Sequence, residues 1–248
     1  MNNKNDVLTR LYNANSNSEK FTILEGVMGD AGFDAVLYSF YPKLSQLAKS
    51  LQPVFQFSKG YEALIKNYQK EDFSDDDFII RLLKEGATEP IDWWFQAKKI
   101  KINDQEKKVN HIARNQFGVT KGICLPTLTN DLGIAGVSLI SFKAEDEHRQ
   151  LDAKDLDRLH HCARMYHNHI MMNQNEQSQF ILPILDLLTP KKKLVIKHLI
   201  SGKPMKSIEG VTERYAEKLL LELRKGFGNI SKNELIYLLG LINISEYL

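Results

Sequence analysis

Four stretches of the chain have the apolar, β-branched and aromatic pattern of β-strands. They cover residues 32–42, 52–57, 122–128 and 134–142, and turn-forming residues flank them. Only the short turn sequence TNDLG separates the last two stretches. We therefore predict that these two form a hairpin within a mainly antiparallel sheet.

Helical spacing dominates between and after these strands. The pattern predicts short helices over 58–69 and 78–86 and a longer helix that begins after Asp152, its expected N-cap. Apolar residues of the longer helix recur three and four positions apart and so share one face: Leu156, Leu159, Ala163, Tyr166 and Ile170. Helices before, between and after the strands predict an α/β/α sandwich in the α+β class.

A polar segment without periodicity, NQNEQSQ, follows the longer helix. We interpret 173–183 as a linker between a first domain, 1–172, and a small all-α domain, 184–248. In the second domain Thr189 and Thr212 are expected N-caps of two helices, and the sequence NELIYLLGLI predicts a third. Two short helices joined by a glycine-containing turn are typical of a helix-turn-helix, with recognition by the helix that follows Thr212.

Composition narrows the class of protein. A chain of 248 residues that is 43% hydrophobic can bury one full-sized core and a small second one. Cys124 and Cys162 are far apart, so neither a disulfide framework nor a zinc site is implied. No signal-like segment and no apolar run of about 18 residues is present, so we expect a cytoplasmic protein that does not enter the membrane.

The charge is unevenly distributed. Residues 1–183 hold 22 Lys and Arg against 24 Asp and Glu, whereas 184–248 hold 11 against 7. A basic excess confined to the smaller domain points to a polyanionic partner for that domain.

One acidic segment, YQKEDFSDDDFI at 68–79, suggests several uses. It could be a solvated loop, a cation site, or a loop with one carboxylate turned inward to hold a ligand. A calcium loop is disfavoured, because the segment lacks the required glycine and the distal glutamate.

Catalytic and metal sites find little support in the sequence. Four histidines in the longer helix, His160, His161, His167 and His169, contain no pair at i, i+4, so we predict surface positions and no metal. The segment GVSLI lacks one glycine of a nucleophile elbow, and no phosphate-binding loop is present. We therefore predict no catalytic residues and no enzyme.

Two sets of segments follow one another in a characteristic order. The first set is AGFDAVLYSFYP, YEALIKNYQKEDFSDDDF, PIDW and FGVTKGICLPTLTNDLGIAGVSLISF, and the second is LTPKKKLVIKHLISGK, VTERYAEKLLLELRKGFG and NELI. With these segments the chain resembles LuxR-type quorum-sensing regulators over nearly its whole length. The first set resembles the family's first strand, ligand loop, tryptophan motif and glycine-rich hairpin, and the second follows the order of its C-terminal DNA-binding domain. The resemblance implies an autoinducer-binding domain, a helix-turn-helix, and no cofactor beyond a small-molecule signal.

The resemblance also implies a set of ligand contacts. In the family, the aspartate that matches Asp77 accepts the amide N–H of an acyl-homoserine lactone, and the tryptophan that matches Trp93 donates to the lactone carbonyl. Tyr68 and Ser138 match the groups that bind the acyl amide oxygen. The walls of the acyl slot are expected from Tyr61, Leu64, Phe73 and Trp94, although Leu64 and Phe78 stand where the family has tryptophan and proline.

For the second domain the resemblance implies a dimer on a palindromic DNA site. Arg214 and Lys218 would lie near base edges, and the phosphates would be met by Lys191, Lys192, Lys193 and Lys225. Two features depart from the family. The chain between Gly202 and Thr212 is about three residues short, almost one helical turn, so we expect a truncated scaffold helix. Glu217 in the recognition helix also opposes a polyanion.

Two functions therefore remain open. The first is a homodimeric, ligand-responsive transcription regulator. The second is an interaction protein of the same fold that no longer binds DNA and pairs with a related regulator, with the apolar tail 238–248 as a pairing surface if it is exposed.

Overall fold

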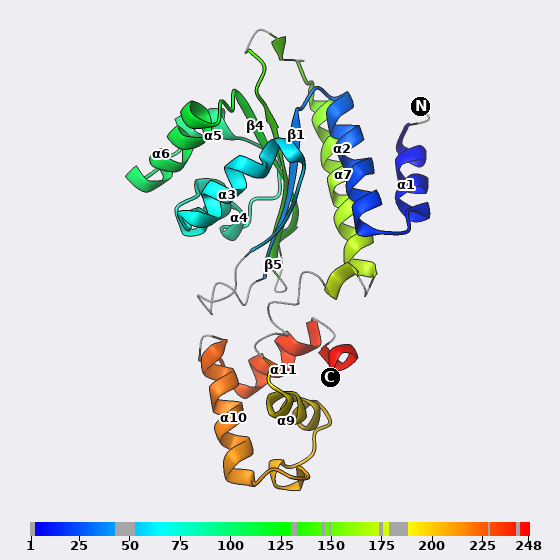
Figure 1. The fold of residues 1–248 in the computed structure, drawn as a ribbon, viewed down its shortest axis with the longest axis vertical. Helices are drawn as coiled ribbons and strands as arrows, with labels where there is room; N and C mark the ends of the chain where they lie inside the picture. The colour runs from blue at the N-terminus through cyan, green and yellow to red at the C-terminus, as the bar shows by residue number, and fades with distance from the viewer. Residues whose placement is uncertain are drawn as a thin grey trace. The chain divides into compact units, whose positions relative to one another are not determined.

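The computed structural model of the chain describes residues 3–42, 53–129, 133–144, 147–148, 150–173, 176–178, 188–227, 229–241 and 244–248. Contacts divide the chain into two compact units, a larger one formed within residues 1–177 and a smaller one that consists mainly of residues 178–248. Figure 1 shows both. None of the helices in these ranges is long and apolar enough to cross a membrane.

The larger unit contains a five-stranded sheet. In chain order its elements are α1 (Asn3–Asn13), α2 (Asn17–Asp30), β1 (Ala35–Pro42), β2 (Val54–Phe57), η2 (Lys59–Tyr61), α3 (Glu62–Lys70), η3 (Phe73–Asp75), α4 (Phe78–Lys84), β3 (Ile91–Asp92), α5 (Trp93–Lys99), α6 (Asp104–His111), η4 (Ile112–Gln116), β4 (Lys121–Thr129), β5 (Gly133–Ser141) and α7 (Ala153–Met172). The strand order is β2-β1-β5-β4-β3, and the β1–β2, β3–β4 and β4–β5 pairs are antiparallel. All nine residues of β5 are buried, as befits the central strand.

Helices cover both faces of this sheet. Helix α7 packs on one face with α2 beside it and α1 outside them, and α3 to α6 lie on the other face (Figure 1). The predicted α/β/α sandwich and its antiparallel hairpin are confirmed: β4 and β5 pair with Cys124 opposite Ser138. Asp152 caps α7 as expected, since its side chain accepts a hydrogen bond from the Asp155 amide.

Two of the four histidines of α7 are not at the surface, so that prediction is wrong. His160 and His167 are buried. His160 Nε2 lies 2.6 Å from the Pro126 carbonyl oxygen, and His167 Nδ1 lies 2.8 Å from the Tyr38 hydroxyl. Each imidazole ring therefore has a polar partner between α7 and the sheet. A neutral imidazole can be buried when it is hydrogen-bonded in this way.

The segment predicted as a linker is partly packed. Glu176 is buried, and its carboxylate pairs with Lys20 of α2 at 2.6 Å, with both side chains under 10% exposed. Polar composition alone suggested a solvated linker, but the pair fixes residue 176 against the larger unit. Most of the remaining predicted linker, 179–183, lies outside the described residues.

The smaller unit has the predicted helices α9 (Pro190–Ile200), α10 (Glu213–Gly226) and α11 (Lys232–Leu241), with the short turns η6 (Met205–Ser207) and η7 (Ile244–Tyr247). Thr189 and Thr212 cap α9 and α10. The expected truncation is also seen: a single 3-10 turn, η6, stands between α9 and α10.

The described residues of the apolar tail do not offer the exposed surface suggested for it. Leu239 and Ile244 are buried in the core of the smaller unit, and Leu238, Tyr247 and Leu248 pack against that core. These tail residues are therefore part of the core of the smaller unit.

Candidate functional site

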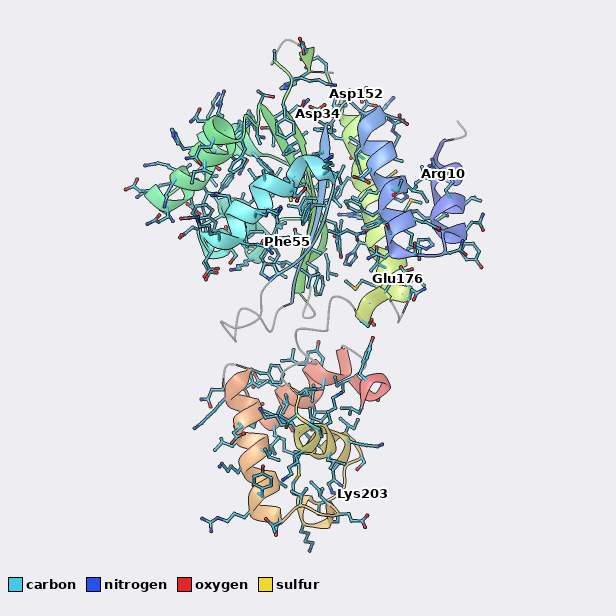
Figure 2. The ribbon with its side chains drawn as sticks, in the orientation of Figure 1. Arg10, Asp34, Phe55, Asp152, Glu176 and Lys203 are labelled. Carbon is cyan, nitrogen blue, oxygen red and sulfur yellow. The ribbon has the colours of Figure 1, made fainter. Side chains whose placement is uncertain are left out.

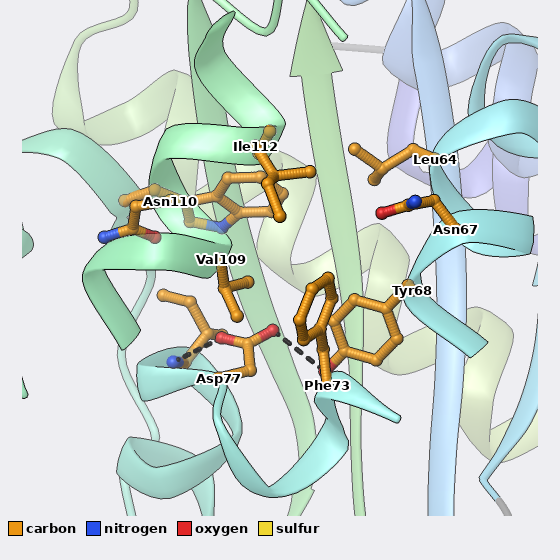
Figure 3. A pocket seen from close by; sticks show the side chains of 11 residues that line it. Leu64, Asn67, Tyr68, Phe73, Asp77, Val109, Asn110 and Ile112 are labelled. Atoms are coloured by element: carbon orange, nitrogen blue, oxygen red, sulfur yellow. Dashed lines mark hydrogen bonds between the residues drawn. The ribbon is translucent and has the colours of Figure 1, made fainter. Parts of the chain in front are cut away.

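A pocket lies in the larger unit among the helices that cover the second face of the sheet (Figure 3). Its wall is formed by Leu64, Asn67, Tyr68, Phe73, Asp77, Ile79, Trp93, Val109, Asn110, Ile112 and Ala113. The space between these residues is about 460 Å³ and is partly open to solvent. Only about 50 Å³ of that space is wide enough to place the centre of a water molecule. This is room for a few waters, whereas a small-molecule pocket usually measures about 300–1,000 Å³.

Asp77 is the acidic residue of the pocket. It is the N-cap of α4: its Oδ1 accepts the Ile79 amide at 2.8 Å, while Oδ2 accepts the Tyr68 hydroxyl at 3.1 Å (Figure 3). Burial raises the pKa of the Asp77 carboxyl, and these two hydrogen bonds oppose the rise. Each carboxylate oxygen can accept a further hydrogen bond, so the group is able to bind a ligand N–H as well.

The neighbouring aspartates have other surroundings. Asp75 is exposed and pairs with Lys84 at 3.1 Å, and Asp76 is partly exposed. Of the three consecutive aspartates, Asp77 alone lines the pocket.

Aromatic rings form the floor of the pocket beside Asp77. Tyr68 makes edge-to-face contacts with Phe55 and Phe73, with ring centroids 6.2 Å and 6.0 Å apart. Phe73 is buried. The Tyr68 hydroxyl is thereby held close to the Asp77 carboxylate.

Trp93 carries an unsatisfied donor. It begins α5, whose N-cap Asp92 accepts the Phe95 amide, and its ring lies close against Gly122 in β4. A Cβ atom on Gly122 would lie 2.3 Å from two ring carbons of Trp93, so only glycine fits there. Trp93 Nε1 is buried and has no hydrogen-bond partner within the described part of the chain. An indole N–H left in this state normally finds a partner, and a ligand in the pocket could supply it.

Three predicted ligand residues do not line the pocket. Trp94 Nε1 donates to the Thr120 carbonyl at 3.0 Å, and the Arg114 guanidinium lies 5.5 Å from its ring, which indicates a structural role. Ser138 is buried in β5 opposite Cys124. Tyr61 is fully buried in the adjoining apolar cluster. Burial raises the pKa of its hydroxyl well above the usual value. No described group forms a hydrogen bond with that hydroxyl.

The structure brings together Leu64, Tyr68, Phe73, Asp77 and Trp93 and adds six residues that the sequence did not indicate: Asn67, Ile79, Val109, Asn110, Ile112 and Ala113. Four of the six come from α6 and η4. Their spacing, with Val109, Ile112 and Ala113 three and four positions apart, was the available signal.

In the smaller unit, α10 presents the predicted DNA-binding residues Arg214, Lys218 and Lys225 at the surface. Lys218 lies 4.0 Å from Glu222. An open groove runs along this helix over Thr212, Arg214, Tyr215, Glu217, Lys218, Leu220, Leu221 and Arg224. This face of α10 is partly charged and partly apolar, because Tyr215 and Leu221 are exposed beside the charged side chains.

The lysines of α9 differ from one another. Lys191 is exposed and its Nζ lies 5.2 Å from the centre of the Tyr215 ring, so it extends the α10 face. Lys192 and Lys193 are partly buried, and Lys193 Nζ donates to the Tyr247 carbonyl at 3.3 Å. Lys193 therefore also fastens the tail, a role that the sequence did not suggest.

No group of three or more His, Cys, Asp or Glu able to hold a metal occurs among the residues that the structure describes. Both cysteines are buried and neither forms a disulfide, and burial raises the pKa of the Cys124 thiol to about 12.

Comparison with known proteins gives a consistent result. No curated protein sequence matches the chain. Among solved structures, Escherichia coli SdiA is similar over 96% of both chains, with 14% identity and a TM-score of 0.60. SdiA in complex with octanoyl-rac-glycerol covers 96% of this chain and 94% of its own, with 14% identity and a TM-score of 0.56. CepR2 from Burkholderia cenocepacia, an N-acylhomoserine lactone dependent LuxR family transcription factor, matches 66% of this chain and 88% of its own, with 16% identity and a TM-score of 0.46.

At 14% identity the two SdiA structures show the fold alone. The family model for the autoinducer binding domain, however, matches residues 16–170, which is more than half of the sequence. The chain therefore belongs to the autoinducer binding domain family, the signal-binding family of LuxR-type quorum-sensing proteins.

Proposed function

We propose that this signal receptor, which is not an enzyme, binds an acyl-homoserine-lactone-like amide in the pocket of the larger unit. The observation that carries the proposal is the buried, unpartnered Trp93 Nε1 in the wall of a pocket that also holds the Asp77 carboxylate. A ligand with an amide N–H and a separate carbonyl would satisfy both groups. An unpaired buried donor costs about 1–3 kcal/mol, which such a ligand recovers.

The polar contacts can be assigned one by one. Asp77 accepts the ligand amide N–H, and Trp93 donates to a carbonyl of the head group. Tyr68 donates to Asp77 in the structure, and rotation of its hydroxyl would let it donate to the acyl amide oxygen instead. Ser138 and Tyr61 lie outside the pocket wall, so contact with either would require the pocket to extend toward β5 and the adjoining apolar cluster.

The narrow cavity implies that the pocket opens around its ligand. Since the pocket has room for only a few water molecules, the helices and side chains that line it must separate to admit an acyl chain. Ligand that binds the folded form only would raise the stability of the larger unit, by about 2.7 kcal/mol at a hundredfold excess over Kd.

The test is calorimetry with N-octanoyl-homoserine lactone on Asp77→Asn and on Asp75→Asn as the matched control. We expect Asp77→Asn to weaken binding about ten- to a hundredfold, the value of one charge-assisted hydrogen bond of about 1.5–3 kcal/mol. Asp75 is exposed, so its variant should bind like the wild type.

A second ligand tests the need for the amide. The octanoyl glycerol seen with SdiA has an ester in place of the amide and so no N–H for Asp77; its affinity should respond little to Asp77→Asn. Equal losses in both aspartate variants, or recovery by mass spectrometry of a co-purified ligand without an amide, would contradict the proposal.

We further propose that the smaller unit binds DNA as part of a homodimer, with Arg214 and Lys218 at base edges and Lys191, Lys192, Lys193 and Lys225 near phosphates. The exposed position of Arg214, Lys218, Lys191 and Lys225 supports it. Glu217 lies on the same groove, so Glu217→Lys should tighten binding to duplex DNA at low salt and steepen its salt dependence, while Arg214→Ala should weaken binding.

A second candidate remains for this unit. Exposed Tyr215 and Leu221 on α10 favour contact with another protein, as in a heterodimer with a related regulator. If neither the wild type nor these variants retard any duplex from a random-sequence library, with or without ligand, the DNA-binding proposal fails and this candidate replaces it.

A further inference from the structure

A basic surface lies on the larger unit, over α5, α6 and η4. Residues 93–116 hold six Lys and Arg against two Asp and Glu. All six cations are exposed: Lys98, Lys99, Lys101, Lys107, Lys108 and Arg114. Together with the exposed ring of Phe95, these side chains form what we call the α5–α6 face.

The two acidic residues of this segment offset little of its charge. Glu106 is buried and pairs with Arg81 of α4 at 2.7 Å, and only Asp104 is exposed, where it pairs with Lys107 at 2.8 Å. The other lysines of the face, Lys98, Lys99, Lys101 and Lys108, form no ion pair with any residue that the structure describes. Their charge is therefore available to a partner.

The charge of this face is opposite to that of the chain around it. Residues 1–183 hold 22 Lys and Arg against 24 Asp and Glu, and leaving out residues 93–116 makes this 16 against 22. Positive charge is thus concentrated in one segment of an otherwise acidic domain. Such segregation indicates a polyanionic partner for the segment.

An exposed aromatic ring lies among these cations. Phe95 is 56% exposed, and helical spacing places Lys98 and Lys99 on its side of α5. Lys99 Nζ lies 4.1 Å from the centre of the Phe95 ring. Next to them, the Arg114 guanidinium of η4 lies 5.5 Å from the ring of Trp94. Figure 2 shows side chains that end in nitrogen extending outward from these helices.

We infer that the α5–α6 face binds the surface of membranes that contain anionic lipids. Clusters of about four to eight Lys and Arg are typical of such binding, because each cation near the surface is attracted to the lipid phosphates. The Phe95 ring would enter the head-group layer, while Lys99 keeps its ammonium among the phosphates. Duplex DNA would also attract the cations, but its phosphate backbone offers no apolar layer to the phenyl ring.

This inference goes beyond the proposed function and does not depend on it. The binding is peripheral and leaves the apolar interior of the bilayer unentered, as the sequence predicts. The same elements supply Trp93, Val109, Asn110 and Ile112 to the wall of the pocket. Binding would therefore bring that wall to the lipid surface.

The experiment measures binding of the full chain, without added ligand, to two kinds of vesicle by flotation. One kind is phosphatidylcholine alone, and the other contains phosphatidylcholine and phosphatidylglycerol in equal parts. The double variant Lys98→Gln, Lys101→Gln removes two cations of the α5–α6 face. Lys70→Gln, Lys154→Gln is the matched control, since it removes two exposed cations of the larger unit outside that face.

We expect the wild type to bind the anionic vesicles in preference to phosphatidylcholine alone, and to bind them less as salt is added. Lys98→Gln, Lys101→Gln should weaken this binding about ten- to thirtyfold, whereas the control should change it less than about twofold. Phe95→Ala should weaken binding about three- to tenfold, because the apolar contribution of its ring is lost.

Three results would overturn the inference. The first is equal binding to both kinds of vesicle, or to neither, by the wild type. The second is an equal effect of the two lysine double variants, which would assign binding to net charge or to the basic smaller unit. The third is a loss of duplex DNA binding in Lys98→Gln, Lys101→Gln with unchanged vesicle binding, which would make the face a nucleic-acid surface.

Discussion

At the scale of single residues, the absence of a side chain at Gly122 decides where Trp93 lies. Gly122→Ala would place a Cβ atom 2.3 Å from the Trp93 ring, so the indole has to move out of the pocket wall. We expect about 1–3 kcal/mol of lost stability, a shifted tryptophan fluorescence maximum and weaker binding of N-octanoyl-homoserine lactone. Chemical denaturation, fluorescence and calorimetry measure the three effects.

Gly26→Ala is the control for this substitution. Gly26 is inside α2, and no atom would lie within 4 Å of an added Cβ. Alanine should therefore stabilise the helix by about 0.5–1 kcal/mol and leave ligand affinity unchanged. Unaltered fluorescence and affinity in Gly122→Ala would mean that Trp93 is not held by this contact.

A second residue makes the stability of the larger unit depend on pH. Burial lowers the pKa of His167 from 6.5 to about 4. Between these values the unfolded chain binds a proton that the folded chain excludes, so stability is complete above pH 6.5 and falls as the pH drops toward 4. This residue accounts for about 3 kcal/mol of that loss.

We expect His167→Gln to flatten the dependence of the unfolding free energy on pH between about 4 and 6.5. His161→Gln is the matched control, since His161 is an exposed histidine of the same helix. Urea denaturation at a series of pH values gives both slopes. Equal slopes in the wild type and in His167→Gln would assign the pH dependence to other groups.

At the scale of residues, the sequence indicated which residues belong to the pocket better than it indicated which side chains are buried. The resemblance selected Asp77 out of three consecutive aspartates, and the structure places that one in the pocket wall. It could not show that His167 is buried against Tyr38, because that contact joins residues 129 positions apart. Asn67 has no signature either, since an asparagine on a helix is usually a solvated residue.

At the scale of elements, strands and capped helices were predictable because their signals are local. Thr189, Thr212 and Asp152 cap the helices they were expected to cap. Helix α6 was missed although Asn103 and Glu106 form a capping box at its start, since its few apolar residues give weak periodicity. The missing helix is the one that supplies a wall of the pocket, so the site was only half predicted.

The packing of α2 against the residues that follow α7 depends on the buried pair Lys20–Glu176. Lys20→Met would leave the Glu176 carboxylate buried and unpaired, which costs about 3–5 kcal/mol. The double variant Lys20→Met, Glu176→Leu removes both charges and should recover most of that loss. Thermal denaturation of the single and double variants measures the difference.

Lys66→Met provides the comparison with a solvated pair. Lys66 and Glu62 form an ion pair on α3 in which the side chains are 73% and 48% exposed. Its loss should change stability by less than about 0.5 kcal/mol. If Lys20→Met also lost less than about 0.5 kcal/mol of stability, the segment around Glu176 would not be fixed in solution.

At the scale of the whole molecule, the two units have separate cores. The core of the smaller unit is formed by residues from Leu188 to Ile244, and it includes the buried face of α10 with Ala216, Leu219, Leu220 and Leu223. Periodicity in the sequence indicates that face, because these four residues lie three and four positions apart. It could not decide whether the apolar tail covers this core or faces solvent, because an apolar segment fits either use.

The tail provides the last test. Truncation after Gly240 removes Ile244, which is 2% exposed, together with Tyr247 and its hydrogen bond to Lys193. We expect the smaller unit to unfold, because loss of one such buried side chain alone costs about 2–5 kcal/mol. Circular dichroism should show a loss of helix, while the larger unit still binds N-octanoyl-homoserine lactone. Ile244→Ala should destabilise the same unit less severely. Loss of self-association with unchanged helix content, measured by light scattering, would instead make the tail a pairing surface.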